Sequence, residues 1–156
     1  DIHKVALHDS PHIYYIKLRP GLEHFFVQMS KLFELHVYTM GSRSYAHSVV
    51  KLFDSDGRLF NDRILSRDDN EIIENRKKLE RIFPTDDRMV LVIDDRSDVW
   101  PNCRNLIQVP AYTFFVGTGD INSPTKQLDG EIGVQEETRA TVLNSNDNVL
   151  LTIERV

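Results

Sequence analysis

Two acidic residues end the most apolar stretch of the sequence. Residues 89–94 read MVLVID, and Asp95 and Arg96 follow directly. Adjacent carboxylates at the end of a strand offer hard oxygen ligands, which Mg²⁺ prefers while it keeps several waters. A second interpretation stays open, in which Asp94 and Asp95 only cap a turn and pair with Arg96. The pattern makes these two aspartates a candidate metal site.

A hydroxyl group follows a second apolar stretch. Residues 35–39 (LHVYT) end in Thr39, and Met40, Gly41 and Ser42 lead into a segment with helical spacing. A hydroxyl beside the amides of a helix N-terminus is well suited to bind phosphate. The alternative is that Thr39 serves only as the N-cap of that helix.

The paired lysines Lys77 and Lys78 come shortly before the acidic pair. We expect them on a helix over residues 71–83, where consecutive side chains diverge by about 100°. Only one of the two would then face a site. A lysine acts on phosphate as a point charge, but paired lysines on a helix are more commonly solvated surface.

The elements that must position these groups alternate along the chain. Strands are predicted at residues 12–18, 35–39, 63–66, 89–94, 106–109 and 113–116, and helices at residues 22–33, 42–53 and 71–83. Such alternation indicates a three-layer α/β fold with a parallel sheet. Ligands of these folds bind beyond the carboxyl ends of the strands, where Thr39 and Asp94 both stand.

Size and composition limit the remaining possibilities. The 156 residues suit one domain, which we place at residues 1–122, with a polar loop and a strand-like tail at residues 123–156. The net charge of −5 argues against direct nucleic-acid binding. We expect no membrane span, because no apolar run approaches the roughly 20 residues required. The single cysteine, Cys103, excludes an internal disulfide and fits a reducing compartment.

Other polar groups carry weaker signals. The sequence Asp54-Ser55-Asp56-Gly57 resembles a D-x-D motif, but it follows a helix and ends in glycine, so we predict a turn. Arg67 and the two aspartates after it have the composition of a salt-bridged turn. Six histidines show no metal-ligand spacing.

Several of these stretches occur together in the order of a known family. They read YYIKLRPG, LHVYTMGSRSYA, LFNDRILSRDD, KKLERIFP, MVLVIDDRSDVWP and FFVGTGDIN. This series, which covers residues 14–122, resembles the catalytic domain of the TFIIF-associated RNA polymerase II carboxy-terminal-domain (CTD) phosphatases. Those enzymes belong to the haloacid dehalogenase superfamily, so the resemblance implies that superfamily's three-layer sheet.

The resemblance also implies a chemistry. It implies a magnesium-dependent protein serine phosphatase that works through an aspartyl-phosphate intermediate. By motif match, Thr39 and Lys77 would bind the phosphoryl group, and Asp94 and Asp95 would form the acidic end of the Mg²⁺ site. Two arginines would bind substrate, namely Arg67 and, with a weaker match, Arg19. The implied partners are the phosphorylated CTD and TFIIF, and the implied location is the nucleus.

One part of the family pattern does not occur in these residues. The family nucleophile stands in a D-x-D-x-T motif at the end of a central strand, and no D-x-D-x-T occurs in the 156 residues. Asp9 is a poor substitute, because Pro11 at its +2 position cannot transfer a proton. We therefore expect the motif and its strand upstream of Asp1, and we expect the chain by itself to be inactive. The alternative function is a non-catalytic phosphopeptide- or protein-binding module of the same fold.

Overall fold

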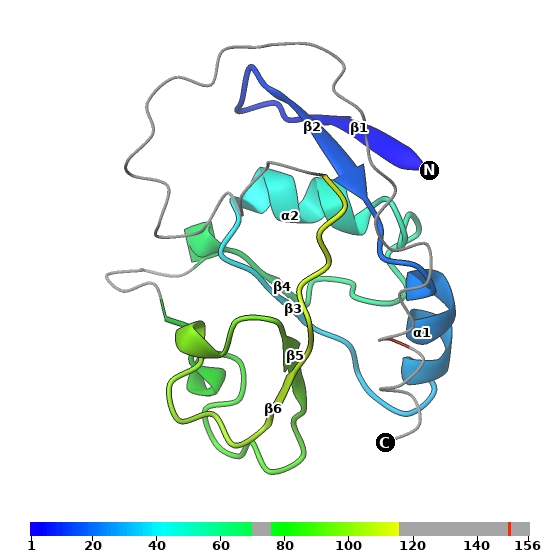
Figure 1. Cartoon of the computed structure of the whole chain (residues 1–156). Coiled ribbons are helices and arrows are strands. Elements are labelled where there is room, and N and C mark those ends of the chain that lie inside the picture. The colour runs from blue at the N-terminus through cyan, green and yellow to red at the C-terminus, as the bar shows by residue number, and fades with distance from the viewer. Residues whose placement is uncertain (70–75, 116–149, 151–156) are drawn as a thin grey trace.

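The computed structural model describes residues 1–69, 76–115 and 150 of the chain (Figure 1). Its strands are β1 (Ile2–Ala6), β2 (Ile13–Lys17), β3 (Val37–Tyr38), β4 (Ile64–Leu65), β5 (Val92–Asp94) and β6 (Leu106–Gln108). Its α-helices are α1 (Leu22–Met29) and α2 (Arg43–Val50), and short 3₁₀ helices are η1 (Arg67–Asp69), η2 (Leu79–Arg81) and η3 (Ser97–Val99). No helix in these ranges is long and apolar enough to cross a membrane.

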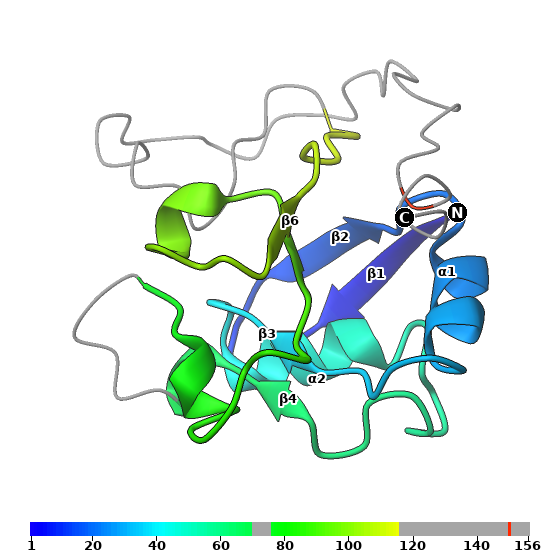
Figure 2. The same cartoon turned by 90° about the horizontal axis from the view of Figure 1, so that it is seen from below.

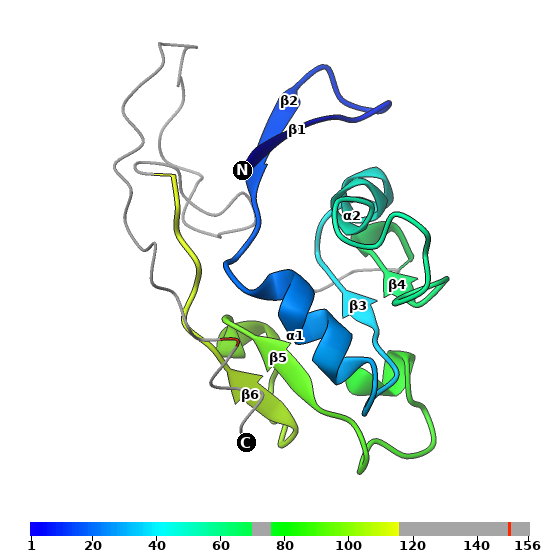
Figure 3. The same cartoon turned by 90° about the vertical axis from the view of Figure 1, so that its right-hand side faces the viewer.

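The strands form three two-stranded units. β3 pairs with β4 and β5 with β6, both in parallel, as predicted from the alternation of strands and helices. β1 and β2 form an antiparallel hairpin, with Val5 opposite Tyr14. The sequence pattern did not predict β1. In Figure 3 the hairpin lies apart from β3 and β4, with α2 beside it.

The ends of the helices follow local sequence. Helix α2 begins where the Ser42 side chain accepts a hydrogen bond from the Tyr45 amide, so Ser42 rather than Thr39 is its N-cap. Helix α1 begins after Gly21, whose φ of 76° is a left-handed conformation that favours glycine. The predicted turn at Asp54–Gly57 is confirmed. There the Asp54 carboxylate accepts hydrogen bonds from the amides of Leu59 and Phe60.

The predicted helix at residues 71–83 is wrong where the structure describes it. Residues 76–78 have no regular secondary structure, the backbone at Lys78 is extended, and only the short η2 follows; residues 70–75 lie outside the described residues. Tertiary hydrogen bonds explain the difference. The Lys77 amide donates to the Val99 carbonyl at 2.7 Å, and the Lys78 amide donates to the Tyr38 hydroxyl at 3.4 Å. Both donors are therefore used by other segments of the chain.

Two predicted strands also differ from the structure. β5 is only three residues long, and just one of its three side chains, Val92, is fully buried, while Leu91 is 58% exposed and Ile93 is 40% exposed. The strand is therefore shorter than the predicted residues 89–94, and part of the apolar run is exposed. Residues 113–115 form no strand, and Val116 lies outside the described residues. In that segment the Phe114 ring lies beneath the Lys17 ammonium, so the contact with β2 is made by a side chain and not by paired backbone.

The core nearest the candidate residues lies between β5 and the loops around it. It consists of Leu79, Val92, Val99 and Trp100, with Tyr38, Phe83, Val90, Cys103 and Leu106 packed against it. Figure 3 shows β5 and β6 side by side, and Figure 2 shows β3 beside β4. The ring centroids of Tyr38 and Trp100 are 5.5 Å apart, so this core brings the ends of β3 and β5 together. The predicted tail at residues 123–156 lies outside the described residues except for Leu150.

Candidate active site

The end of β5 holds a buried ion pair. Lys77 Nζ lies 2.6 Å from Asp94 Oδ2, and the two side chains are only 10% and 12% exposed. The same carboxylate oxygen accepts a hydrogen bond from the Trp100 indole at 2.7 Å, and Oδ1 accepts one from the Arg96 amide at 3.0 Å. Every oxygen of this buried carboxylate therefore has a donor, as a charge removed from water requires.

Opposing effects act on the pKa of Asp94. Burial, the largest single effect, raises the pKa, because it disfavours the charged carboxylate. The hydrogen bond and the charge of Lys77 lower it, together with the Trp100 indole and the Arg96 amide, and these donors prevail. The pKa of Asp94 is lowered overall. Asp94 is thus an ionised acceptor that holds the ammonium of Lys77 in place.

The two lysines have different surroundings. The Lys77 side chain is only 10% exposed and faces Asp94, whereas Lys78 is exposed. The expected separation of their side chains is found, but its cause is the extended backbone at Lys78 (φ −136°, ψ 125°), where successive side chains alternate, and not a helix. The geometry places Lys77, the residue selected by the family register, beside the acids.

Asp95 lies on the open side of the same strand end. It is exposed, and it lines a pocket of about 370 Å³ together with Asp94, Ile93, Arg19 and the segment 109–112. The Arg19 guanidinium donates to the Pro110 carbonyl at 2.9 Å and lies 5.6 Å from the centre of the Tyr112 ring. Three of the predicted residues, Arg19, Asp94 and Asp95, are therefore brought to one pocket.

The donor chemistry of this pocket suits a magnesium ion. Mg²⁺ is usually held by one or two carboxylates, waters and the oxygens of a phosphate substrate, which agrees with two adjacent aspartates. Asp94 and Asp95 both line the pocket, and Asp95 is the more exposed of the two. The described ranges, 1–69, 76–115 and 150, contain no group of three or more histidine, cysteine or acidic side chains that could hold a metal.

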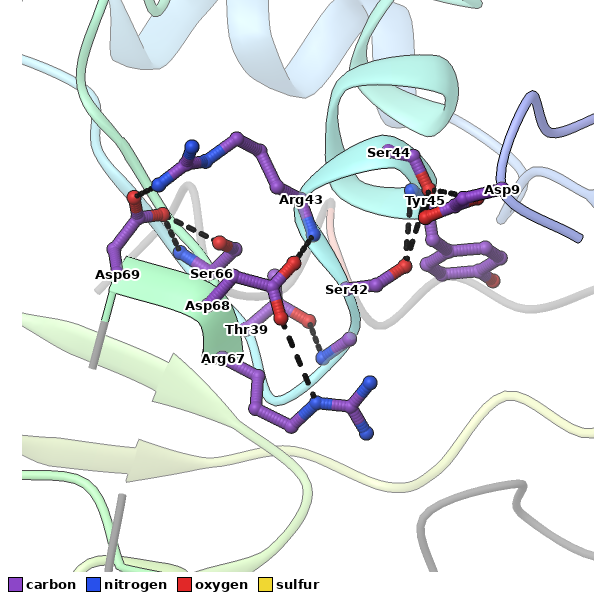
Figure 4. A network of polar contacts seen from close by, with 11 residues as sticks. Asp9, Thr39, Ser42, Arg43, Ser44, Tyr45, Ser66, Arg67, Asp68 and Asp69 are labelled. Carbon is purple, nitrogen blue, oxygen red and sulfur yellow. Dashed lines mark hydrogen bonds and ion pairs between the residues drawn. The ribbon is translucent and has the colours of Figure 1, made fainter. Parts of the chain in front are cut away.

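Thr39 and Arg67 belong to a second cluster, at the start of α2 (Figure 4). The Gly41 amide donates to Thr39 Oγ1 at 3.0 Å, and the Arg67 amide donates to the Gly41 carbonyl at 3.0 Å. The turn at residues 39–41 is thereby fixed to η1. The Arg67 side chain is exposed, and its Nε lies 3.9 Å from Asp68 Oδ1.

Two further aspartates connect η1 to α2 in this cluster. The Arg43 amide donates to Asp68 Oδ2 at 2.7 Å, and the Arg43 guanidinium pairs with Asp69. The Ser66 hydroxyl and amide also donate to Asp69, and these contacts with the Arg43 charge lower the pKa of Asp69 to about 2. The sequence indicated a charged turn at residues 67–69 but gave no sign that Arg43 completes it.

Asp9 makes a contact with Ser44 that connects two parts of the fold. Ser44 donates to both of its carboxylate oxygens at 2.6 Å, which joins the β1–β2 loop to α2 (Figure 4). The Ser44 hydrogen bond is the main cause that lowers the pKa of Asp9. A second aspartate at the +2 position, which the family motif requires, is replaced here by Pro11.

Tyr38 is the connection between the two clusters. It is the last residue of β3 and directly precedes Thr39. Its ring contacts both Trp100 and the Lys77 ammonium. Sequence reasoning missed Tyr38 and Trp100. The available signal was the Asp-Val-Trp that closes the acidic segment, although nothing in its spacing indicated that the indole turns back to Asp94.

Comparison with known proteins identifies the family of the chain. A family model described as NLI interacting factor-like phosphatase matches residues 2–129. The chain belongs to the NLI interacting factor-like phosphatase family. Within this phosphatase family, it is 53% identical over 128 residues to an RNA polymerase II C-terminal domain phosphatase of Saccharomyces cerevisiae. It is 49% identical over 111 residues to the human protein of the same name.

The matched regions are small parts of those relatives. The alignments cover 81% and 69% of this chain but only 17% of the yeast phosphatase and 11% of the human one. A solved structure of Fcp1, an essential RNA polymerase II CTD phosphatase, matches with a TM-score of 0.82 and 40% identity, over 99% of this chain and 50% of that one.

A second structure, of the fission yeast phosphatase Fcp1 bound to beryllium fluoride, matches with a TM-score of 0.74 and 51% identity. This alignment covers 78% of the present chain and 34% of the other. The predicted fold class, the three-layer haloacid-dehalogenase-like α/β fold, and the predicted family are therefore confirmed.

Proposed function

We propose that this chain is the phosphate- and metal-binding part of a magnesium-dependent protein serine phosphatase that acts on the RNA polymerase II CTD in the nucleus. The observation that carries the proposal is the buried Lys77–Asp94 ion pair beside the exposed carboxylate of Asp95. The sequence identity between this chain and CTD phosphatases supports the proposed substrate, because those relatives are named for it. TFIIF is proposed as a further partner on the family resemblance.

Each residue has a role that its position permits. Lys77 has three N–H donors, so it can bind Asp94 and still donate to a phosphoryl oxygen. The Thr39 hydroxyl, which accepts from Gly41, keeps its own proton to donate to the same group. Exposed Arg67 and pocket-lining Arg19 would bind the substrate peptide. Asp95, with Asp94 behind it, would hold Mg²⁺, whose charge stabilises a transferring phosphoryl group when it is bound.

The nucleophile belongs to the same proposal. A D-x-D-x-T segment would supply one aspartate whose carboxylate attacks phosphorus and displaces the serine oxygen. A second aspartate would give that oxygen its proton and then take one from the water that hydrolyses the aspartyl-phosphate. Beryllium fluoride bound to the fission yeast relative supports a site of this kind, because it imitates a phosphoryl group.

The test compares two polypeptides on an aryl phosphate with Mg²⁺. The 156-residue chain is expected to be inactive, and the chain together with a D-x-D-x-T segment is expected to hydrolyse the substrate. In the active protein, Lys77→Ala should lose most activity, while Lys78→Ala should keep at least about half, as expected for a surface residue. Hydrolysis by the 156 residues alone would contradict the assignment of the nucleophile. A protein that carries the segment, binds phosphopeptide and stays inactive would be a binding module instead.

A further inference from the structure

The ammonium group of Lys77 lies beside two aromatic rings that are adjacent to each other. Its Nζ is 5.4 Å from the centre of the Trp100 ring and 5.7 Å from the centre of the Tyr38 ring. The two rings contact each other edge to face, with an interplanar angle of 83°. A cation within about 6 Å of an aromatic face is attracted by its quadrupole, and the attraction is strongest for tryptophan.

Trp100 also contacts the acid that pairs with Lys77. Its indole N–H donates to Asp94 Oδ2 at 2.7 Å, the same oxygen that accepts from Lys77 Nζ at 2.6 Å. Trp100 is 5% exposed and belongs to the core with Val92, so its ring has little freedom to move. One fixed side chain therefore restrains both members of the ion pair.

The backbone strengthens this arrangement. The Lys77 amide donates to the carbonyl of Val99, the residue that precedes Trp100. The Trp100 ring thus contacts the Lys77 side chain, while the carbonyl of the preceding residue, Val99, binds the Lys77 backbone. A lysine side chain has many rotamers, and a site that acts on a phosphoryl group needs the ammonium in one of them.

We infer that Trp100 is a positioning residue that, together with the adjacent ring of Tyr38, orients Lys77 and Asp94 for work on the phosphoryl group. The catalytic part of this inference depends on the proposed function. Trp100 itself need not touch the substrate. Groups that orient a binding residue typically change activity 10- to 100-fold when they are altered.

The first test is a double-mutant cycle in the active protein that carries a D-x-D-x-T segment. Trp100→Phe keeps a ring and removes the indole N–H, and we expect kcat to fall about tenfold while KM for a phosphopeptide changes less than about twofold. In a Lys77→Ala background the same substitution should cost less than about twofold, because a residue that acts through Lys77 has nothing left to position. Equal losses in both backgrounds, or an unchanged kcat, would overturn the inference.

A matched control separates positioning from packing. Phe83 packs against the same core as Trp100, and its ring contacts that of His36, with the two centroids 5.2 Å apart. Phe83→Leu should lower the melting temperature at least as much as Trp100→Phe but leave kcat within about twofold of the unmodified protein. If Phe83→Leu lowers kcat as strongly as Trp100→Phe, general loss of packing explains both effects and the inference fails.

The second test needs no phosphatase activity. Trp100 is the single tryptophan of the 156 residues, so the chain with ¹⁵N-labelled tryptophan gives one indole N–H resonance. A hydrogen bond to a buried carboxylate should shift the indole proton downfield and slow its exchange with water, and Asp94→Ala should abolish both effects. Fast exchange in the unmodified chain would overturn the inference, even where Trp100→Phe fails to fold. A bound indole in an inactive complete phosphatase would instead count against the proposed function and the catalytic role that depends on it.

Discussion

The two clusters of the candidate site hold their charges in different ways. At the end of β5, Lys77 and Asp94 are 10% and 12% exposed, and an indole and a backbone amide complete the contacts of the acid. At the start of α2, Arg43 is 58% exposed and Asp69 is 24% exposed, and much of the network consists of hydrogen bonds between side chains and backbone amides.

This difference has physical consequences. A buried ion pair loses much of its hydration, so removal of one partner leaves an unpaired charge that strongly destabilises the folded protein. An exposed pair is screened by water, and each contact contributes little. We call the Lys77–Asp94 pair with its contacts the β5 cluster, and the network of Arg43, Asp68 and Asp69 the α2 cluster. We therefore expect the β5 cluster to control both stability and chemistry. We expect the α2 cluster to adjust the position of the turn at residues 39–41 and of Arg67.

The largest effect is expected at the acids of the β5 cluster. In the active protein, Asp94→Asn and Asp95→Asn should each lower kcat/KM by at least about a hundredfold, because a metal ion at developing charge contributes several kcal/mol. Steady-state kinetics with Mg²⁺ would measure this. Near-normal rates in both variants would mean that the two aspartates only cap a turn.

The difference in exposure between the two clusters predicts unequal losses of stability. Lys77→Ala should lower the free energy of unfolding by about 3 kcal/mol, since it leaves Asp94 buried without its cation. Arg43→Ala should lower it by no more than about 1 kcal/mol, since the Arg43 side chain is 58% exposed and water screens its pair with Asp69. Urea unfolding followed by circular dichroism measures both. Similar losses for the two variants would remove the distinction between the clusters.

Arg67 should affect substrate binding more than chemistry. Its side chain is exposed at η1, so its loss should remove binding that the ground state and the transition state share. Arg67→Ala should raise KM for a phosphorylated CTD peptide several-fold and change the turnover of a small aryl phosphate much less. An equal loss on both substrates would place Arg67 at the reacting phosphorus.

The smallest effect concerns acid stability at the α2 cluster. The pKa of Asp69 is about 2 in the folded chain and lies near 3.9 in an unfolded one, so the unfolded state binds the proton more readily. The contribution of Asp69 to stability is therefore present above about pH 4 and is lost as the pH falls toward 2. Thermal unfolding should show a deficit for Asp69→Asn at pH 6 that shrinks toward pH 2. A constant deficit would show that the charge of Asp69 is unimportant.

Local sequence determined much of the secondary structure. Residues 13–17, 37–38 and 92–94 form strands within predicted stretches, because their β-branched, aromatic and apolar residues lie between turn signals. The start of α2 at a serine cap and the turn at Asp54–Gly57 likewise depend on nearby hydrogen bonds. Motif order was sufficient to predict the family and to select the candidate site residues, whose catalytic roles remain predictions.

Only the tertiary structure decided how those residues meet. The segment at Lys77 has the composition of a helix, but the Lys77 amide donates to the carbonyl of Val99 in η3, and with that long-range hydrogen bond residues 76–78 form no helix. The indole of Trp100 reaches Asp94 because η3, which lies between the end of β5 and Trp100, turns the chain back on the strand end. Contacts between residues far apart in the chain leave no periodic signal in the sequence, so the two aromatic rings beside Lys77 are a property of the fold.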